Sequence, residues 1–190
     1  MARFTQLTYT ETVFQRFSRG LGEAEAGIYR KAILSQLPDA LRELAYRVAQ
    51  STDRAYLEKT YSPIALVSGS ADLSTNTDML YDYIRRVTDA SSNVYGRLRH
   101  RSDLDNPRQE FHFFYAIEGN TFYARQGDGV TVPSNQNFSF IASFIPVVHA
   151  TVAASTTVPE QLNSLLEAIG HEQFRPPSVG YQRTGQPATA

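Results

Sequence analysis

The sequence of 190 residues contains no cysteine and no tryptophan. Without thiols, disulfides, thiolate metal sites and cysteine nucleophiles are excluded together, and the redox compartment stays undecided. Charged residues make up only 19% of the chain and the formal net charge is −1, so the chain as a whole has no strong attraction for nucleic acid or an anionic membrane. Polar residues interrupt every apolar run near the N-terminus, and no run has the length of a membrane-spanning helix. We therefore expect neither a signal peptide nor contact with a membrane.

Motifs of catalysis are also missing. The four histidines have no metal-binding spacing, and the sequence contains no nucleophile elbow, phosphate-binding loop or dinucleotide-binding glycine pattern. His112, which alternates with phenylalanines, is interpreted as a structural residue. We expect a protein that is not an enzyme, with no catalytic residue, cofactor or metal.

Aromatic residues are abundant instead, with 11 Tyr and 11 Phe. They are densest in residues 111–125, FHFFYAIEGNTFYAR, which predict a β-hairpin closed by Gly119 and Asn120, two residue types that tolerate tight turns. Such a hairpin needs a partner layer. The aromatic strand near 138–147 supplies one, and its alternation places Phe138, Phe140, Ala142 and Phe144 on one face. The predicted cross-strand pairs are Glu118–Thr121, Ile117–Phe122, Ala116–Tyr123 and Tyr115–Ala124.

Apolar periodicity predicts helices near residues 23–34, 38–51 and 158–170. Pro38 is expected in the first turn of the second of these. Thr157 and Glu160 have the spacing of a capping box for the third, and Gly170 is expected to end it. A further short helix is expected from Thr10, with glycines at its end. Strands are predicted near 63–68, 84–88, 94–101, 111–117, 121–125 and 138–147. The first is expected to be bounded by Pro63 and Gly69, with a polar turn region after Gly69.

Helices flanking a block of strands predict an α+β fold rather than repeated βαβ units. We expect residues 1–170 to form a single domain whose β part covers about 61–148. Residues 171–190, rich in proline and glycine, are expected to form a C-terminal extension.

Two stretches are candidates for binding. The first is basic and includes Arg85, Arg86, Arg97, Arg99 and Arg101. If residues 97–101 are extended, alternate arginines point the same way and can face phosphates or an acidic partner. The alternative is a solvated surface balanced by nearby aspartates, including Asp82, Asp89 and Asp103.

The second candidate is the C-terminal extension, interpreted as an arm that docks on a partner. Phe174, Val179 and Tyr181 are its candidate anchors, and Arg175 and Arg183 its candidate ionic contacts. The alternatives are a flexible tail and a segment that packs on its own domain.

The order of elements resembles a known family. A helix opened by LPDALRELAYRVA is followed by SPIALVSGS, YIRRVT, FYAIEGNTFYAR and FSFIASFIPVV, and VPEQLNSLLEAIGHEQF closes the set. Over residues 37–170 this pattern resembles the head–tail adaptor (neck or head-completion) proteins of tailed bacteriophages, in which a helical part carries a small β-domain.

The resemblance implies a structural virion protein, assembled in the host cytoplasm. It would form a homo-oligomeric ring, usually a dodecamer, between the portal protein and the tail or nozzle protein. It also implies that residues 171–190 dock on portal subunits, and that the arginines of 85–101 face a neighbouring subunit or packaged DNA. The alternatives are another tail, baseplate or tail-completion protein, and a small carbohydrate- or peptide-binding module that uses an exposed row of Phe114, Tyr123 and Phe138.

Overall fold

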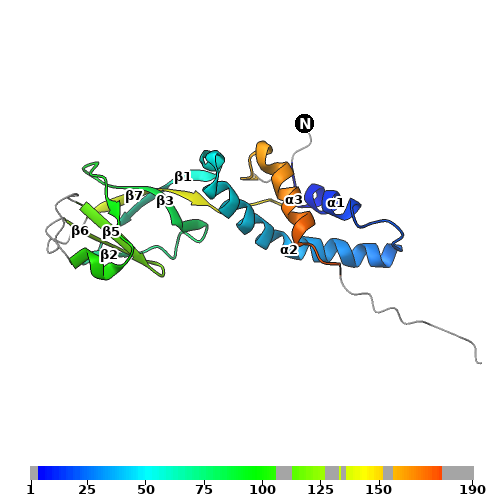
Figure 1. Ribbon diagram of the computed structural model, residues 1–190, viewed down its shortest axis with the longest axis horizontal. Helices are drawn as coiled ribbons and strands as arrows, with labels where there is room; N and C mark the ends of the chain where they lie inside the picture. Colours follow the sequence, from blue (N-terminus) through cyan, green and yellow to red (C-terminus); the bar gives the residue numbers. More distant parts are fainter. Residues whose placement is uncertain (1–3, 106–112, 127–132, 134–135, 152–155, 177–190) are drawn as a thin grey trace, which may run out of the picture. The chain divides into compact units, whose positions relative to one another are not determined.

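A computed structural model describes residues 4–105, 113–126, 133, 136–151 and 156–176. The fold is α+β, as predicted, with antiparallel and mixed sheets (Figure 1). The chain divides into two compact units. We call Met1–Glu43 with Val147–Ala190 the helical unit, and Leu44–Pro146 the β unit. The β unit contains the expected β part, and the helical unit is formed by both ends of the chain.

The helical unit contains α1 (Gln6–Gln15), most of α2 (Glu23–Gln50), the 3-10 turn η3 (Glu160–Leu162) and α3 (Asn163–Gln173). The helix expected from Thr10 begins earlier, because the Thr5 hydroxyl accepts a hydrogen bond from the backbone N–H of Thr8 and caps α1.

The two helices predicted at 23–34 and 38–51 are one continuous helix, α2, with Pro38 in its interior. Interior proline removes one backbone hydrogen bond and costs about 3 kcal/mol in an isolated helix. In α2 this cost is offset by burial on both sides of the proline. The buried residues of this stretch are Ile33, Leu37, Ala40, Leu41, Leu44 and Ala45.

The predicted capping box does not form. The Thr157 hydroxyl accepts from the backbone N–H of Val147 at 2.6 Å instead of capping the helix, and α3 starts at Asn163 without a side-chain cap. Gly170 does not stop α3 either, since the helix continues to Gln173.

Gly170 marks a close approach between α3 and α1. A Cβ at this position would lie 2.8 Å from Cγ2 of Val13 and would also collide with the Tyr9 ring and hydroxyl. Real Cβ atoms do not come this near to other heavy atoms, so glycine is required here by the packing of the two helices.

Burial of Tyr9 makes stability sensitive to alkaline pH. Burial raises the pKa of the Tyr9 phenol to about 12, because the ionised form is poorly solvated. Tyrosine is protonated in both states below about pH 10, so the stabilisation is intact there and is lost between pH 10 and about 12, where only the unfolded chain ionises. Urea unfolding at about pH 8 and pH 11 should show a smaller pH-dependent loss for Tyr9→Phe than for the wild type. Equal losses would contradict this assignment.

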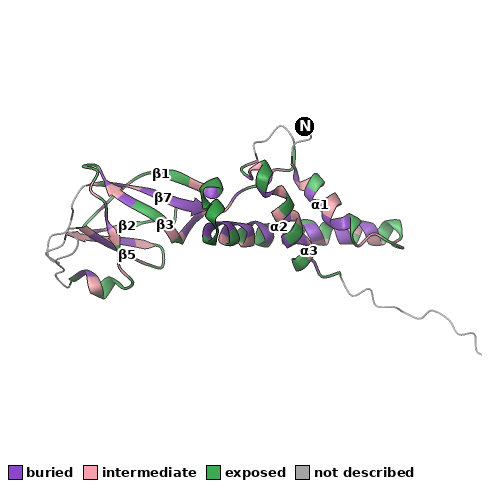
Figure 2. Cartoon of the chain, turned by 45° about the horizontal axis from the view of Figure 1, so that its top comes forward, coloured by how far each residue is buried: buried purple, intermediate pink, exposed green. Residues whose placement is uncertain are grey.

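The β unit is a sandwich of two sheets. One has the order β1–β7–β3, made of Glu58–Ala65, Asn137–Phe144 and Met79–Asp89. The other has the order β2–β6–β5–β4, made of Ser70–Asp72, Thr121–Gln126, Phe113–Glu118 and Gly96–Arg97. The main core lies between them, where Phe122 of β6 contacts Phe138 and Phe140 of β7 with ring centroids 5.2 and 5.1 Å apart. Figure 2 shows how much of β7 is buried in this layer.

The central hairpin has the predicted register in all four pairs. Gly119 takes a φ of 57° at the first central position of the turn, a conformation that suits glycine. Tyr115 and Phe122 face the main core. The other hairpin face buries Phe114 and Ala116 with Leu104 of the 3-10 helix η2 (Arg101–Asp105).

Several strand bounds differ from the prediction. β1 begins at Glu58 and includes Pro63, because β1 is an edge strand with a register shift at that point, and both features tolerate proline. β3 is longer than 84–88, and β7 ends at Phe144, before Pro146. β2 lies in the stretch predicted as a turn, since three residues are too few to show a period. The strand predicted at 94–101 is reduced to Gly96–Arg97 in β4.

Candidate functional surfaces

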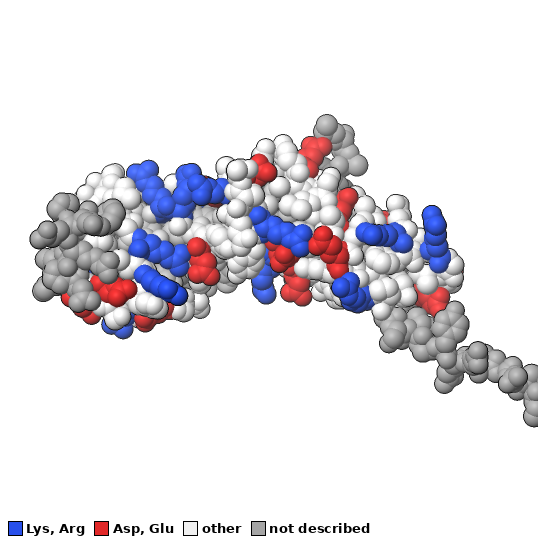
Figure 3. Space-filling view, in the orientation of Figure 1, with Lys and Arg blue, Asp and Glu red and all other residues white. Residues whose placement is uncertain are grey.

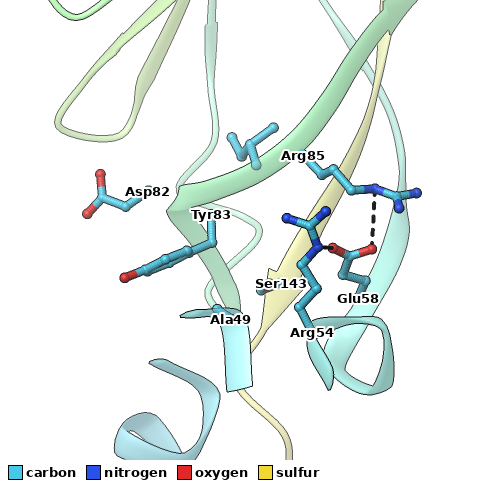
Figure 4. Close-up of a pocket in the computed structure, with 8 residues that line it drawn as sticks. Ala49, Arg54, Glu58, Asp82, Tyr83, Arg85 and Ser143 are labelled. Carbon is cyan, nitrogen blue, oxygen red and sulfur yellow. Dashed lines mark ion pairs between the residues drawn. The ribbon is translucent and has the colours of Figure 1, made fainter. Parts of the chain in front are cut away.

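A polar hollow of about 210 Å³ opens in the β unit between the end of α2, β1 and β3. Glu58 is one of its lining residues; the Glu58 side chain is only 9% exposed and lies between two arginines. Arg85 Nε is 3.3 Å and Arg54 Nε 3.8 Å from the carboxylate oxygens. Figure 4 shows the two guanidinium groups approaching Glu58 from different sides, with Asp82 and Tyr83 apart from them. The arginines therefore neutralise a carboxylate of the same unit.

The end of α2 is fixed to this region through Tyr83. Gln50 Nε2 donates a hydrogen bond of 2.7 Å to the Tyr83 hydroxyl, and the Tyr46 ring meets the Tyr83 ring edge-on at 5.8 Å between centroids. All three residues belong to the β unit, and Tyr83 lines the hollow.

The Glu58 cluster is open to a direct test. Glu58→Gln would leave Arg54 and Arg85 facing each other without a carboxylate, and both are half exposed, so we expect a loss of about 1 kcal/mol. Because screening weakens the repulsion between the arginines, the loss should shrink at high salt. Urea unfolding at low and high ionic strength measures it, with Asp53→Asn, a nearby exposed change, as the control. A loss that does not depend on salt would contradict the electrostatic role.

The predicted basic stretch is not one continuous row. Residues 99 and 100 form a bend and η2 starts at Arg101, so the extended segment expected over 97–101 does not exist. Arg97 donates to the Asp82 carbonyl at 2.9 Å and pairs with its carboxylate, whereas the Arg101 guanidinium lies 4.3 Å from the Tyr123 ring centroid. Of the five arginines, Arg86, Arg99 and Arg101 are exposed with no ion pair among the described residues, and of these three Arg101 has the ring contact.

Acidic residues are interleaved with the arginines on the face of the β unit drawn in Figure 3. Glu58 and Asp82 neutralise Arg85 and Arg97, and Asp105 lies 3.6 Å from Arg125. Much of this region is therefore a surface on which acids balance the arginines, which was the alternative to a basic binding site. Asp89, named there as a balancing charge, is instead buried and accepts hydrogen bonds from the backbone N–H groups of Ser91 and Asn93.

Of the five candidate docking residues near the C-terminus, Phe174 and Arg175 lie among the described residues. Phe174 is 2% exposed, and its ring contacts Phe17 and Tyr29 at 4.9 and 5.8 Å between centroids, all within the helical unit. Phe174 is thus a core residue of its own unit and not a free anchor for a partner. Arg175 is exposed and donates to the Glu172 carbonyl at 2.8 Å. Val179, Tyr181 and Arg183 lie outside the described residues.

Sequence reasoning missed the Glu58 cluster and the close contact at Gly170. Glu58 and Arg85 are far apart in the sequence and meet only because β1 and β3 flank the same strand. The signal available for Gly170 was a glycine inside an apolar helical pattern, which also fits a helix end.

Metal and membrane sites were sought in the same described residues. No group of three or more His, Asp or Glu side chains there is placed to hold a metal ion. None of the helices described is both long and apolar enough to cross a membrane.

Comparison with known proteins does not assign the chain to a family. No protein-family model and no curated protein matches the sequence.

Proposed function

We propose that the protein is a structural virion component of a tailed bacteriophage, a head–tail adaptor that forms a ring between the portal and the tail. In this role its C-terminal segment docks on portal subunits. The action is mechanical: many copies seal the DNA exit and offer a platform to the tail or nozzle protein.

The observation that carries the proposal is the organisation of the chain. A small aromatic β unit is inserted into a helical unit formed by both ends of the chain, which is the arrangement that the resemblance implies. Phe174, which is buried against Phe17, fixes the chain to the helical unit shortly before the proposed docking segment.

The test is assembly with the portal protein of the same phage. Purified protein mixed with portal rings should co-migrate with them in size-exclusion chromatography, and negative-stain images should show an added ring on the portal. Native mass spectrometry of the complex would give the number of subunits, with a dodecamer expected. A protein found instead only at the tail or baseplate would point to the related tail-completion role.

Contact with packaged DNA is the proposed role of the exposed arginines. Arg86→Glu combined with Arg99→Glu should weaken non-specific binding of duplex DNA and reduce its salt dependence, because each lost phosphate contact removes about one counterion from the slope. Arg97→Glu is the comparison, since Arg97 is already paired with Asp82. Fluorescence anisotropy at several salt concentrations measures the slope. Unchanged binding in the double variant would remove DNA from the list of partners.

The binding-module alternative needs an exposed aromatic row that the described residues do not provide. Phe114 and Phe138 are 3% and 0% exposed, and they belong to different core clusters. Tyr123 is partly buried under Arg101. Within the described part of this hairpin, a carbohydrate or peptide therefore finds no exposed aromatic platform.

A further inference from the structure

The helical unit has one helix face with unusual composition for a surface. We call it the outer stripe of α2: Ala24, Ile28, Lys31, Leu34, Ser35, Pro38 and Arg42, all exposed and opposite the buried side of the helix. Ile28 is 56% and Leu34 41% exposed. The charges on this exposed side of α2 are Lys31, Arg42 and Asp39, a net charge of +1, and none of the three has an ion-pair partner among the described residues. An apolar, weakly positive helix face of this kind is typical of a contact surface.

The same unit carries a second helix face with the opposite charge. The outer face of α3 has the small exposed residues Ser164 and Ala168 one turn apart, flanked by Glu160 in η3 and Glu167. The helix α3 has no lysine or arginine, and neither Glu160 nor Glu167 has an ion-pair partner among the described residues. Small side chains leave a shallow groove on a helix into which larger ones can pack.

We propose that the outer stripe of α2 docks on the outer face of α3 of a second copy of the chain. Ile28 and Leu34 would fill the space left by Ser164 and Ala168, while Lys31 and Arg42 approach Glu160 and Glu167. Charge complementarity selects a second copy as the occupant, since each copy presents both signs on separate faces.

Such a contact is heterologous, because it joins two different surfaces. Heterologous contacts repeat head to tail and close into a ring when the rotation between neighbours allows it, whereas an isologous contact stops at a dimer. This contact would be the one between neighbouring subunits of the proposed ring, and only its biological role rests on the proposed function. It is tested on this protein alone, so its failure is separate from a failure to bind portal.

The first experiment measures the mass of the wild-type protein by analytical ultracentrifugation between about 1 µM and 1 mM, a range that includes weak interfaces. We expect mass to rise with concentration beyond a dimer. A protein that stays monomeric over the range, or stops at a dimer, would overturn the proposal.

The second experiment uses two blocked variants. Ile28→Glu with Leu34→Glu disables the α2 stripe. Ser164→Gln with Ala168→Gln fills the space on the α3 face without adding a charge that could pair with the new glutamates. Each variant alone should be monomeric, with its dissociation constant raised about 100-fold or more. Mixed in equal amounts, they should form a heterodimer and nothing larger, because one intact face remains on each partner. Absence of that heterodimer in the mixture would contradict head-to-tail docking.

The matched control is Val67→Glu, which places the same charge on an apolar residue of the β unit that is 68% exposed. It should self-associate like the wild type. Circular dichroism melts of every variant show whether the fold is kept, and a control as impaired as the α2 variant would attribute the effect to charge alone and overturn the proposal.

Discussion

Replacing Gly170 with alanine is expected to destabilise the protein by about 2–3 kcal/mol, the cost of overpacking a rigid contact. The added Cβ would lie 2.8 Å from Cγ2 of Val13 and 2.9 Å from Cζ of Tyr9, and both of these residues are buried. Neither is the free end of a flexible side chain, so relief requires that α1 and α3 move apart. Valine at the same position should cost still more. Urea unfolding of the wild type and the variant measures the difference.

The control for this prediction is Gly27, which lies in α2, where an added Cβ would have no heavy atom within 4 Å. There alanine should stabilise the protein by about 0.5–1 kcal/mol, because only the helix propensity changes. Combining Gly170→Ala with Tyr9→Phe removes the hydroxyl that the new methyl group meets and should recover part of the loss. The collision with Val13 would remain. If alanine has the same effect at both glycines, the close contact of α1 and α3 is wrong.

The sequence predicted the structure best in the hairpin, where the alternation of side chains and a recognisable turn both depend on neighbouring residues. The hairpin register followed from the period of two and from Gly119 with Asn120, and all four pairs are correct. The same alternation placed Phe138, Phe140 and Ala142 on one face of β7, where they join the main core. Neither result required knowledge of contacts between distant residues.

Local rules failed where tertiary burial outweighed them. Pro38 and Pro63 were both interpreted as boundaries, yet one lies within α2 and the other within β1. Flanking buried residues offset the first, and an edge position with a bulge accommodates the second. Gly170 was interpreted as a helix end, but its position is set by the approach of α1.

The candidate binding residues show a related limit. Counting arginines between residues 85 and 101 ignored acids that the fold brings near them from elsewhere, such as Glu58 beside Arg85. Phe174 was assigned to the arm on composition, since proline follows it closely. Its burial depends on Phe17 and Tyr29, which belong to other segments of the helical unit. Contacts between residues so far apart in the sequence do not produce a periodic pattern in it.

Two changes near the C-terminus should separate folding from portal binding. Phe174→Ala removes a ring that is 2% exposed and packed against Phe17 and Tyr29, so we expect a loss of about 3–4 kcal/mol in unfolding free energy. Deletion of residues 177–190 removes no described contact of the helical unit and should leave stability nearly unchanged. Urea unfolding of both proteins measures these expectations.

For portal binding we expect the deletion to have the larger effect and Phe174→Ala the smaller one. The deletion variant should no longer join portal rings, because the proposed docking residues Val179, Tyr181 and Arg183 are gone. Phe174→Ala keeps those residues and, at a temperature where it is folded, should retain most of its affinity. Phe174→Leu is the matched control, since it keeps much of the buried volume. A deletion variant that binds portal like the wild type would exclude the docking arm, and a Phe174→Ala variant of unchanged stability would show that this ring does not anchor the start of the arm.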